Sequence, residues 1–129
     1  MLISIDEGDP RPLYAQIAAD IKEQIRAGAL RPGDELPSVR ELADSLAINL
    51  HTVHHAYRQL REQGIIRLRL GRRARVAPLR GQPASRDVVE VQLVGRLNEI
   101  ITEAYHLGLT TEDFRALVDE LLAKGKGER

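Results

Sequence analysis

The stretch of sequence that decides the fold is LPSVRELADSLAINLHTVHHAYRQLREQGIIRLRLGRRARV, residues 36–76. Its first part predicts a short helix near residues 39–46. Ser38 and Glu41 have the spacing of a capping box, in which the serine hydroxyl accepts from a free amide at the helix start and the glutamate reaches back to the serine amide. This pair therefore marks where the helix begins.

The same stretch continues with a second helix and a hairpin. Asn49 is a typical N-cap for a helix that reaches Gln63, and Gly64 supplies the left-handed residue that ends it. Residues 65–70 and 74–77 then read as two strands joined by a tight turn. The expected fold is mainly α with a small β-hairpin wing: a winged helix-turn-helix followed by a two-helix dimerisation tail.

Four motifs in this order resemble the GntR family of bacterial transcription regulators. They are PLYAQI at 12–17, GALRPGDELPSVRELA at 28–43, TVHHAYRQL at 52–60 and the GRRARV wing at 71–76. Several linked motifs are far more specific than one short pattern. The short tail resembles the YtrA-like subfamily. The resemblance implies a DNA-binding regulator, whose relatives often control transporter operons.

Three positions depart from the family's usual pattern. Leu50 stands where the family often has arginine or proline, and His51 is not the usual neighbour of Thr52. Arg73 replaces the second glycine of the common GRG wing. All three lie at or near the expected DNA surface, so the resemblance does not supply the operator sequence.

The charges are unevenly distributed although they sum to zero over the 129 residues. Residues 37–80 carry nine arginines against three acids, whereas residues 1–36 and 81–129 are both acidic on balance. Such a cationic block suits a protein that presents one face to phosphates. The chain has no cysteine and no run of the ~20 apolar residues that cross a membrane. We expect a soluble, cytoplasmic protein with no cofactor and no membrane partner.

The N-terminal part predicts one strand and one helix. Residues 2–5 read as a short strand, and Pro12 suits the first position of a helix whose apolar stripe ends at Ala27. Gly28 ends that helix. Residues 30–37 contain two prolines and a Pro-Gly turn, which predict an ordered loop.

A change of composition divides the chain. Residues 78–85 are rich in Pro, Gly, Gln and Ser, which marks a linker between a DNA-binding domain at 1–77 and a C-terminal domain at 86–129. The C-terminal domain begins with a helix over residues 86–107, which Gly108 ends.

A final helix follows, opened by Thr110 and Asp113. The two helices carry more apolar surface than they can cover between them, so we expect the same pair from a second subunit to cover it. The alternative is that both helices fold back on the first domain. The expected dimerisation residues are Val94, Leu97, Ile100, Ile101, Ala104, Phe114, Leu117, Val118 and Leu121.

The second helix of the motif has an apolar side and a polar side. Val53, Ala56, Tyr57 and Leu60 fall on the core side at 100° per residue. The opposite side is free to enter a major groove. By resemblance, the start of the preceding helix approaches the DNA backbone, although Arg40 has an alternative role in a structural ion pair. The wing tip suits a minor groove or a phosphate. The expected DNA-binding residues are Ser38, Arg40, Asn49, His51, Thr52, His54, His55, Arg58, Gly71, Arg72 and Arg73.

Three histidines on that helix permit a second interpretation. His51, His54 and His55 bring three imidazoles near one face, as a metal site would require. We favour contact with DNA, because zinc takes a fourth ligand, carboxylates are scarce nearby, and a metal would block the groove-reading surface. Histidine changes charge between pH 5 and 8, so we expect affinity for DNA to rise as the pH falls.

These features predict a homodimeric, sequence-specific DNA-binding regulator, most simply a repressor of an inverted-repeat operator. The alternative is a protein-interaction module whose winged helix docks another protein. No Gly-rich phosphate loop, HExxH motif or nucleophile elbow supports an enzyme. The tail is short for enclosing an ordinary effector pocket of ~300 Å³ within one subunit. The sequence identifies neither an effector nor target genes.

Overall fold

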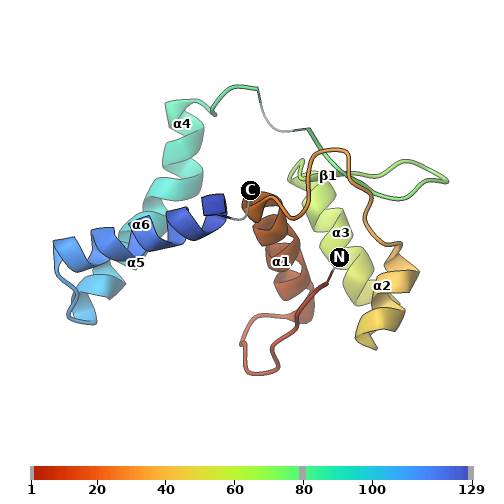
Figure 1. Ribbon diagram of the computed structural model, residues 1–129, viewed down its shortest axis with the longest axis horizontal. Helices are drawn as coiled ribbons and strands as arrows, with labels where there is room; N and C mark the ends of the chain where they lie inside the picture. The colour runs from red at the N-terminus through yellow and green to blue at the C-terminus, as the bar shows by residue number, and fades with distance from the viewer. Residues whose placement is uncertain (1, 79–80, 128–129) are drawn as a thin grey trace. The chain divides into compact units, whose positions relative to one another are not determined.

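The computed structural model describes residues 2–78 and 81–127, which divide into two compact units near residue 80. We call them the N-terminal unit and the C-terminal unit. In Figure 1 the first runs from red to green and the second from cyan to blue. The elements of the N-terminal unit are α1 (Leu13–Ala27), α2 (Val39–Leu46), α3 (Leu50–Glu62), β1 (Ile66–Arg67) and β2 (Arg75–Val76).

The three helices of the N-terminal unit enclose a single core. Helix α3 packs against both α1 and α2, and it also contacts β1. The side chains of Ile17, Ile21, Val53 and Leu60 are completely buried there. Both helices of the helix-turn-helix lie where the sequence predicted them, and Gly64 has the expected left-handed backbone, with φ 75°. The rest of the core is made by Ala18, Leu30, Leu36, Leu42, Ala43, Ala56, Tyr57, Ile66, Ala74 and Val76.

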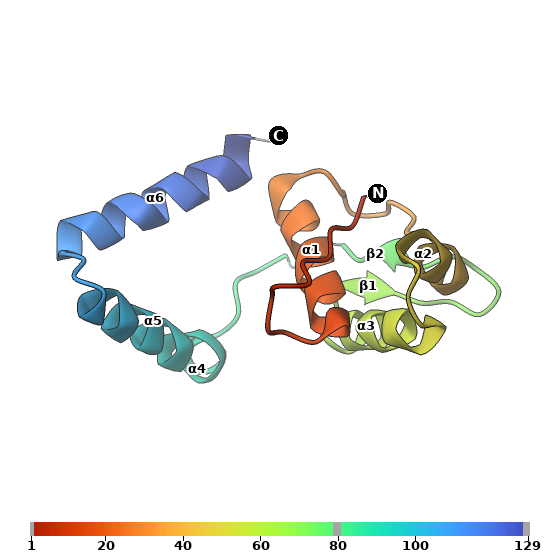
Figure 2. The same cartoon turned by 90° about the horizontal axis from the view of Figure 1, so that it is seen from below.

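The wing is a shorter hairpin than the sequence predicted. Strands β1 and β2 are antiparallel, with Ile66 opposite Val76, and each is only two residues long (Figure 2). The predicted strands at 65–70 and 74–77 are therefore too long. Ile66 is buried, but Leu68 and Leu70 are exposed, because no residue that the structure describes covers the hairpin beyond its base. An apolar alternation without such a cover does not extend the strand.

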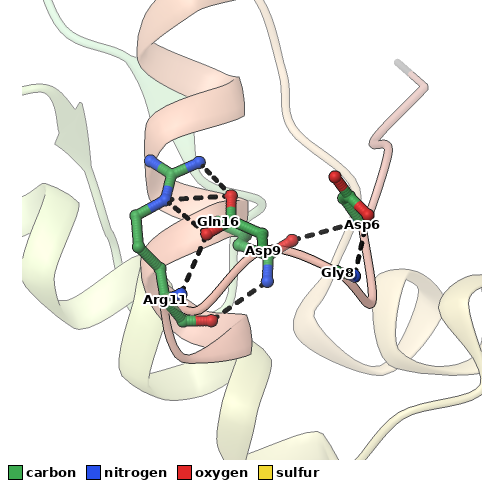
Figure 3. Close-up of polar contacts among 5 residues, drawn as sticks. All are labelled: Asp6, Gly8, Asp9, Arg11 and Gln16. Atoms are coloured by element: carbon green, nitrogen blue, oxygen red, sulfur yellow. Dashed lines mark hydrogen bonds and ion pairs between the residues drawn. The ribbon is translucent and has the colours of Figure 1, made fainter.

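The segment before α1 is tied to that helix instead of forming the predicted strand at residues 2–5. The buried Gln16 accepts a hydrogen bond from the amide of Asp6 at 2.9 Å and donates to the carbonyl of Arg11 at 3.0 Å (Figure 3). Asp9 pairs with Arg11 at 2.6 Å. Pro12 is the N-cap of α1 rather than its first residue, since its ψ of 152° is extended.

The C-terminal unit consists of two long helical segments. The first is continuous from Arg86 to His106, but it contains a π-helical stretch between its two α-helical parts. The sequence predicted the helix and its end at Gly108, where φ is 87°, but not this stretch. A π turn takes in an extra residue, so apolar positions on its two sides do not share one 3.6-residue stripe. The elements are α4 (Arg86–Val89), η1 (Glu90–Val94), α5 (Gly95–His106) and α6 (Thr111–Gly127).

The start of α6 follows the sequence prediction. The hydroxyl of Thr110 accepts from the amide of Asp113 at 3.1 Å, and the carboxylate of Asp113 accepts from the amide of Thr110 at 3.0 Å. These two bonds lower the pKa of Asp113. Across the described ranges of the chain, none of the helices has the length and apolar character needed to span a membrane.

Candidate nucleic-acid interface

The beginning of α2 is fixed by the predicted capping box. The hydroxyl of Ser38 accepts from the amide of Glu41 at 3.0 Å, and the carboxylate of Glu41 accepts from the amide of Ser38 at 3.2 Å. Arg40 is exposed beside this cap, and it has no ion pair with any residue that the structure describes. The alternative structural role for Arg40 therefore has no partner here, and its guanidinium is available to a ligand.

The beginning of α3 is capped by Asn49. Its side-chain oxygen accepts from the amide of His51 at 2.8 Å, as expected of an N-cap. Thr52 lies one residue further along and is half-buried. The cap fixes the direction in which the first turn of α3 leaves the preceding turn, and so it orients the side chains on the polar face.

The core side of α3 is anchored by Tyr57. This side chain is buried, and its hydroxyl donates a hydrogen bond of 2.7 Å to the carbonyl of Pro37, in the loop before α2. Burial raises the pKa of Tyr57. The bond joins α3 directly to the loop before α2, so it holds α3 at a fixed position relative to the start of α2.

The polar side of α3 carries the side chains that sequence reasoning assigned to DNA. His51, His54, His55 and Arg58 are all exposed. Arg58 donates a hydrogen bond of 2.9 Å to Nδ1 of His54, one helical turn earlier. This contact holds the two side chains together and leaves the remaining donors of the guanidinium available to a base edge or a phosphate.

His55 differs from its neighbours because it contacts another helix. Its ring lies edge-on to the ring of Tyr14 in α1, with centroids 3.8 Å apart and planes at 61°. Sequence reasoning missed this contact, since the two residues are far apart in the chain. The only signal was that Tyr14 stands beside the apolar stripe of its helix. His55 therefore helps to fix α3 on α1, although its side chain is exposed.

The metal interpretation of the histidines gains no support from the geometry. Within the described part of the chain, no group of three or more His, Cys, Asp or Glu side chains is placed to hold a metal ion. The polar face of α3 is better described by the His54–Arg58 hydrogen bond and the Tyr14–His55 ring contact.

The wing tip presents Arg72 on a turn. Gly71 has a left-handed backbone with φ 74°, and the amide of Arg72 donates to the carbonyl of Arg69 at 3.1 Å. Leu70 is fully exposed beside them. The side chain of Arg72 has no ion pair among the described residues, so it projects as a free cation.

Arg73 and Arg75 are instead paired with acids. Arg73 lies 2.5 Å from Glu41 and 3.8 Å from Glu35, and Arg75 lies 2.7 Å from Glu35. Arg75 also donates to the carbonyl of Gly33 at 2.7 Å. Arg75 therefore ties the wing to the loop before α2.

The inner surface of the wing forms a small hollow of about 220 Å³ with a strongly cationic lining. Arginines contribute most of its wall, together with Gly33, Val76 and Pro78. A hollow of this kind attracts anions such as backbone phosphates. The arginines that line it are Arg67, Arg69, Arg72, Arg73 and Arg75.

A second hollow lies within the C-terminal unit, between α5 and α6. It is an open, mainly apolar groove of about 550 Å³. Because this groove is open, it does not enclose a ligand as an ordinary pocket of ~300 Å³ does. Of the predicted dimerisation residues, Ala104 is buried and Val94, Phe114 and Val118 are partly buried, while the exposed ones are Leu97, Ile100, Ile101, Leu117 and Leu121.

Comparisons of the sequence with known proteins agree with one another. Residues 13–76 match the family model described as bacterial regulatory proteins, gntR family. The chain is 34% identical over 129 residues to the HTH-type transcriptional repressor YtrA of Bacillus subtilis. That alignment covers 98% of this chain and 96% of the relative, so the similarity includes the C-terminal helices.

Two solved structures extend the comparison. A transcriptional antiterminator from Listeria monocytogenes EGD-e superposes with a TM-score of 0.85 at 30% identity, covering 94% of this chain and 90% of that one. The DNA-binding domain of AraR in complex with operator ORX1 superposes with a TM-score of 0.51 at 29% identity, covering 57% of this chain and 87% of that one. In the second of these structures, the AraR domain that is similar to this chain is bound to operator DNA.

Proposed function

Because the chain belongs to the gntR family of bacterial regulatory proteins, we propose that it acts as a homodimeric repressor. In this proposal two copies bind an inverted-repeat operator, each through the polar side of α3, the start of α2 and the wing. The operator-contacting residues proposed are Ser38, Arg40, Asn49, His51, Thr52, His54, His55, Arg58, Gly71 and Arg72.

Family membership confirms the coarser part of the sequence prediction. The chain is a DNA-binding transcriptional regulator with a winged helix, its relatives are regulators rather than enzymes, and its whole-length relative is YtrA. The alternative of a module that docks another protein gains nothing from these relatives. Operator DNA lies in the cytoplasm of bacteria, so a cytoplasmic location is part of the proposal.

The observation that carries the proposal is the combination of an anchored helix with an exposed polar face. Tyr57 holds α3 from its core side, while His51, His54 and Arg58 are exposed on the other side. A helix of this kind can enter a major groove without rearrangement, and its donors and acceptors then meet base edges. Arg72 at the wing tip adds a free cation for the backbone or the minor groove.

The proposed dimer rests on the apolar face of the C-terminal unit. The side chains of Leu97, Ile100, Ile101, Leu117 and Leu122 are between 43% and 52% exposed. Covering the exposed part of each would contribute about 1 kcal/mol. A second copy offers the same apolar helices in return, as a two-fold interface requires, and it would fill the groove between α5 and α6. Dimer symmetry would then set the spacing of the half-sites.

The repressor role is supported by one relative, the transcriptional repressor YtrA, which this chain matches over nearly its whole length. A regulator that blocks an operator needs only binding, which suits a chain of this size. Control of a transporter operon was implied by the family resemblance, and it remains part of the proposal.

The test is selection of bound duplexes from a randomised DNA library at two salt concentrations, followed by sequencing. We expect enrichment of an inverted repeat with two equivalent half-sites. Binding that shows no enrichment and disappears steeply with salt would overturn sequence-specific regulation, because it would reflect phosphate contacts alone. Enrichment of a single half-site would retain α3 as the reader and overturn the dimer.

Two variants test the division of labour within the interface. His54→Ala removes a side chain from the groove-reading face, so we expect it to change the enriched bases. Arg72→Ala removes a phosphate or minor-groove contact, so we expect weaker binding to all sequences and a salt slope smaller by about 1. If both variants gave the same effect, the proposed separation of base reading from backbone contact would be wrong.

A further inference from the structure

The two arginines at the wing tip have different surroundings, although they are adjacent in the sequence. We propose that Arg73 is a positioning residue that fixes the wing to α2 through Glu41, and that Arg72 alone carries the direct contact of the tip with DNA. The sequence assigned both arginines to DNA. This inference rests on the proposed function only for its consequences at the operator, since the latch itself belongs to the free protein.

Glu41 contacts both the cap of α2 and the wing. One oxygen of its carboxylate, Oε1, accepts from the amide of Ser38 at 3.2 Å and from Arg73 at 2.5 Å. The same carboxylate therefore closes the capping box of α2 and binds the wing. Its pKa is lowered to about 2, first by Arg73 and then by Ser38, and that of Arg73 is raised by Glu41. The pair links residues 32 positions apart, so it joins the start of α2 to the tip of the wing.

A ladder of backbone hydrogen bonds lies next to this pair. The amide of Leu36 donates to the carbonyl of Ala74, and the amide of Val76 donates to the carbonyl of Asp34, both at 2.9 Å. Glu35 and Arg75 form a backbone bridge, and their side chains pair at 2.7 Å. The returning strand of the wing is thus held along the loop before α2. Arg73 stands directly before this ladder and extends it by a side-chain contact.

Contact of Arg73 with DNA would disrupt its ion pairs with Glu41 and Glu35. A phosphate would have to displace Glu41 and leave two carboxylates, Glu41 and Glu35, beside the anionic duplex. Arg72 has no such cost, because no acid within the described residues pairs with it. Electrostatics therefore favours Arg72 for the phosphate and leaves Arg73 with its acids. This division also gives a role to the arginine at the position where relatives often have glycine.

The decisive variant is Glu41→Gln, because glutamine also serves in a capping box. The substitution keeps the cap of α2 and removes the charge that holds Arg73. If Arg73 positions the wing, Glu41→Gln weakens operator binding as Arg73→Ala does. If Arg73 contacts DNA, Glu41→Gln frees the guanidinium and removes a repulsive carboxylate, so it strengthens binding. The two interpretations predict effects of opposite sign.

Hydrogen exchange of the free protein tests the latch without DNA. The probes are the amides of Leu36 and Val76, which belong to the ladder. An exposed ion pair contributes up to about fivefold in an equilibrium constant, so we expect exchange to accelerate by up to about fivefold in Arg73→Ala and in Glu41→Gln. Arg72→Ala should leave both amides unchanged. Ser38→Ala, which weakens the cap but keeps the pair, is the control for damage to α2.

Operator binding of the intact protein then separates the roles. We expect Arg73→Ala and Glu41→Gln each to weaken affinity up to about fivefold, and the double variant to be no weaker than either one. The salt slope should remain that of the unaltered protein in Arg73→Ala but fall by about 1 in Arg72→Ala. A slope that falls in Arg73→Ala, or ladder amides that do not respond to it, would overturn the positioning role. If selection yields no operator, the proposed function fails and the exchange data still decide on the latch.

Discussion

The N-terminal unit buries Ile17, Ile21 and Tyr57 almost completely, whereas the C-terminal unit leaves Leu97, Ile100 and Ile101 about half exposed. The first unit surrounds its core with three helices and the base of a hairpin, so a single chain satisfies its apolar side chains. The second consists of two helical segments, and two helices have too few faces to cover each other's apolar residues. The first unit thus buries its own core, and the second leaves large apolar side chains about half exposed.

The largest effect should come from placing a charge in that open surface. In the proposed dimer, Ile101→Glu buries an unpaired carboxylate in each copy, at a cost of about 3–5 kcal/mol per copy. We expect light scattering to show twice the chain mass of 14.4 kDa for the unaltered protein and the single-chain mass for the variant. The matched control is Leu2→Glu, at an exposed leucine of the other unit, which should leave the mass unchanged. An unaltered protein that is monomeric at high concentration would contradict the dimer.

A substitution in the core of the N-terminal unit should lower stability to the same extent whether or not the protein dimerises. Ile21→Ala removes a completely buried side chain, and such truncations cost about 2–5 kcal/mol of the free energy of unfolding. Denaturant unfolding of the N-terminal unit should show this loss at every protein concentration. Ile100→Ala, in the open surface, should instead have an effect that depends on protein concentration. If both variants were equally sensitive to concentration, the contrast between the two units would be wrong.

The sequence predicted interactions between residues close together in the chain, but not those between distant segments. The caps at Ser38 and Thr110 were predictable because both partners lie within three residues. The contact of Tyr14 with His55, and that of Glu41 with Arg73, join segments that only the folded chain brings together. The order of residue types along the chain carries no information on such distant pairs. Arg73 was therefore assigned to DNA by its residue type and its place in the wing alone.

The lengths of the elements were also beyond the sequence wherever they depend on surrounding layers. Leu68 and Leu70 alternate with arginines as a strand would, yet β1 ends at Arg67, because within the described residues both leucines remain exposed. The π-helical stretch at Glu90–Val94 gives no signal in a pattern read at 3.6 residues per turn. Ends of strands and irregular turns are set by packing, whereas helix caps are set by the residues themselves.

A smaller change tests the bond that locks the recognition helix to the closed unit. Tyr57→Phe removes the hydrogen bond to the carbonyl of Pro37, so we expect a loss of about 0.5–1.5 kcal/mol in the free energy of unfolding at pH 7. Burial raises the pKa of Tyr57 in the folded state above its ordinary value of 10.0. The unfolded chain therefore releases this proton first, and stability falls as the pH rises above 10.

The pH dependence separates this tyrosine from other groups that titrate in alkali. The unaltered protein should lose up to about 1.4 kcal/mol per pH unit above pH 10 through Tyr57, and Tyr57→Phe should lack that part of the slope. Tyr105→Phe is the control, because its side chain is 74% exposed. Identical alkaline slopes in the unaltered protein and Tyr57→Phe would show that the buried hydroxyl is not what couples the helices.

The smallest effect concerns strain that the closed unit tolerates. Ala47, in the turn between α2 and α3, has a left-handed backbone with φ 55°, which costs a residue with a Cβ roughly 1–2 kcal/mol. Ala47→Gly relieves that strain but adds freedom to the unfolded chain, so we expect a net gain of about 0.5–1 kcal/mol in thermal or denaturant unfolding. Ala116→Gly, in the regular part of α6, should instead lose about 0.5–1 kcal/mol. If the free energy of unfolding rises in Ala47→Gly and falls in Ala116→Gly, packing in the N-terminal unit, and not local preference, holds Ala47 in this conformation. A fall in both variants would mean that the turn carries no such strain.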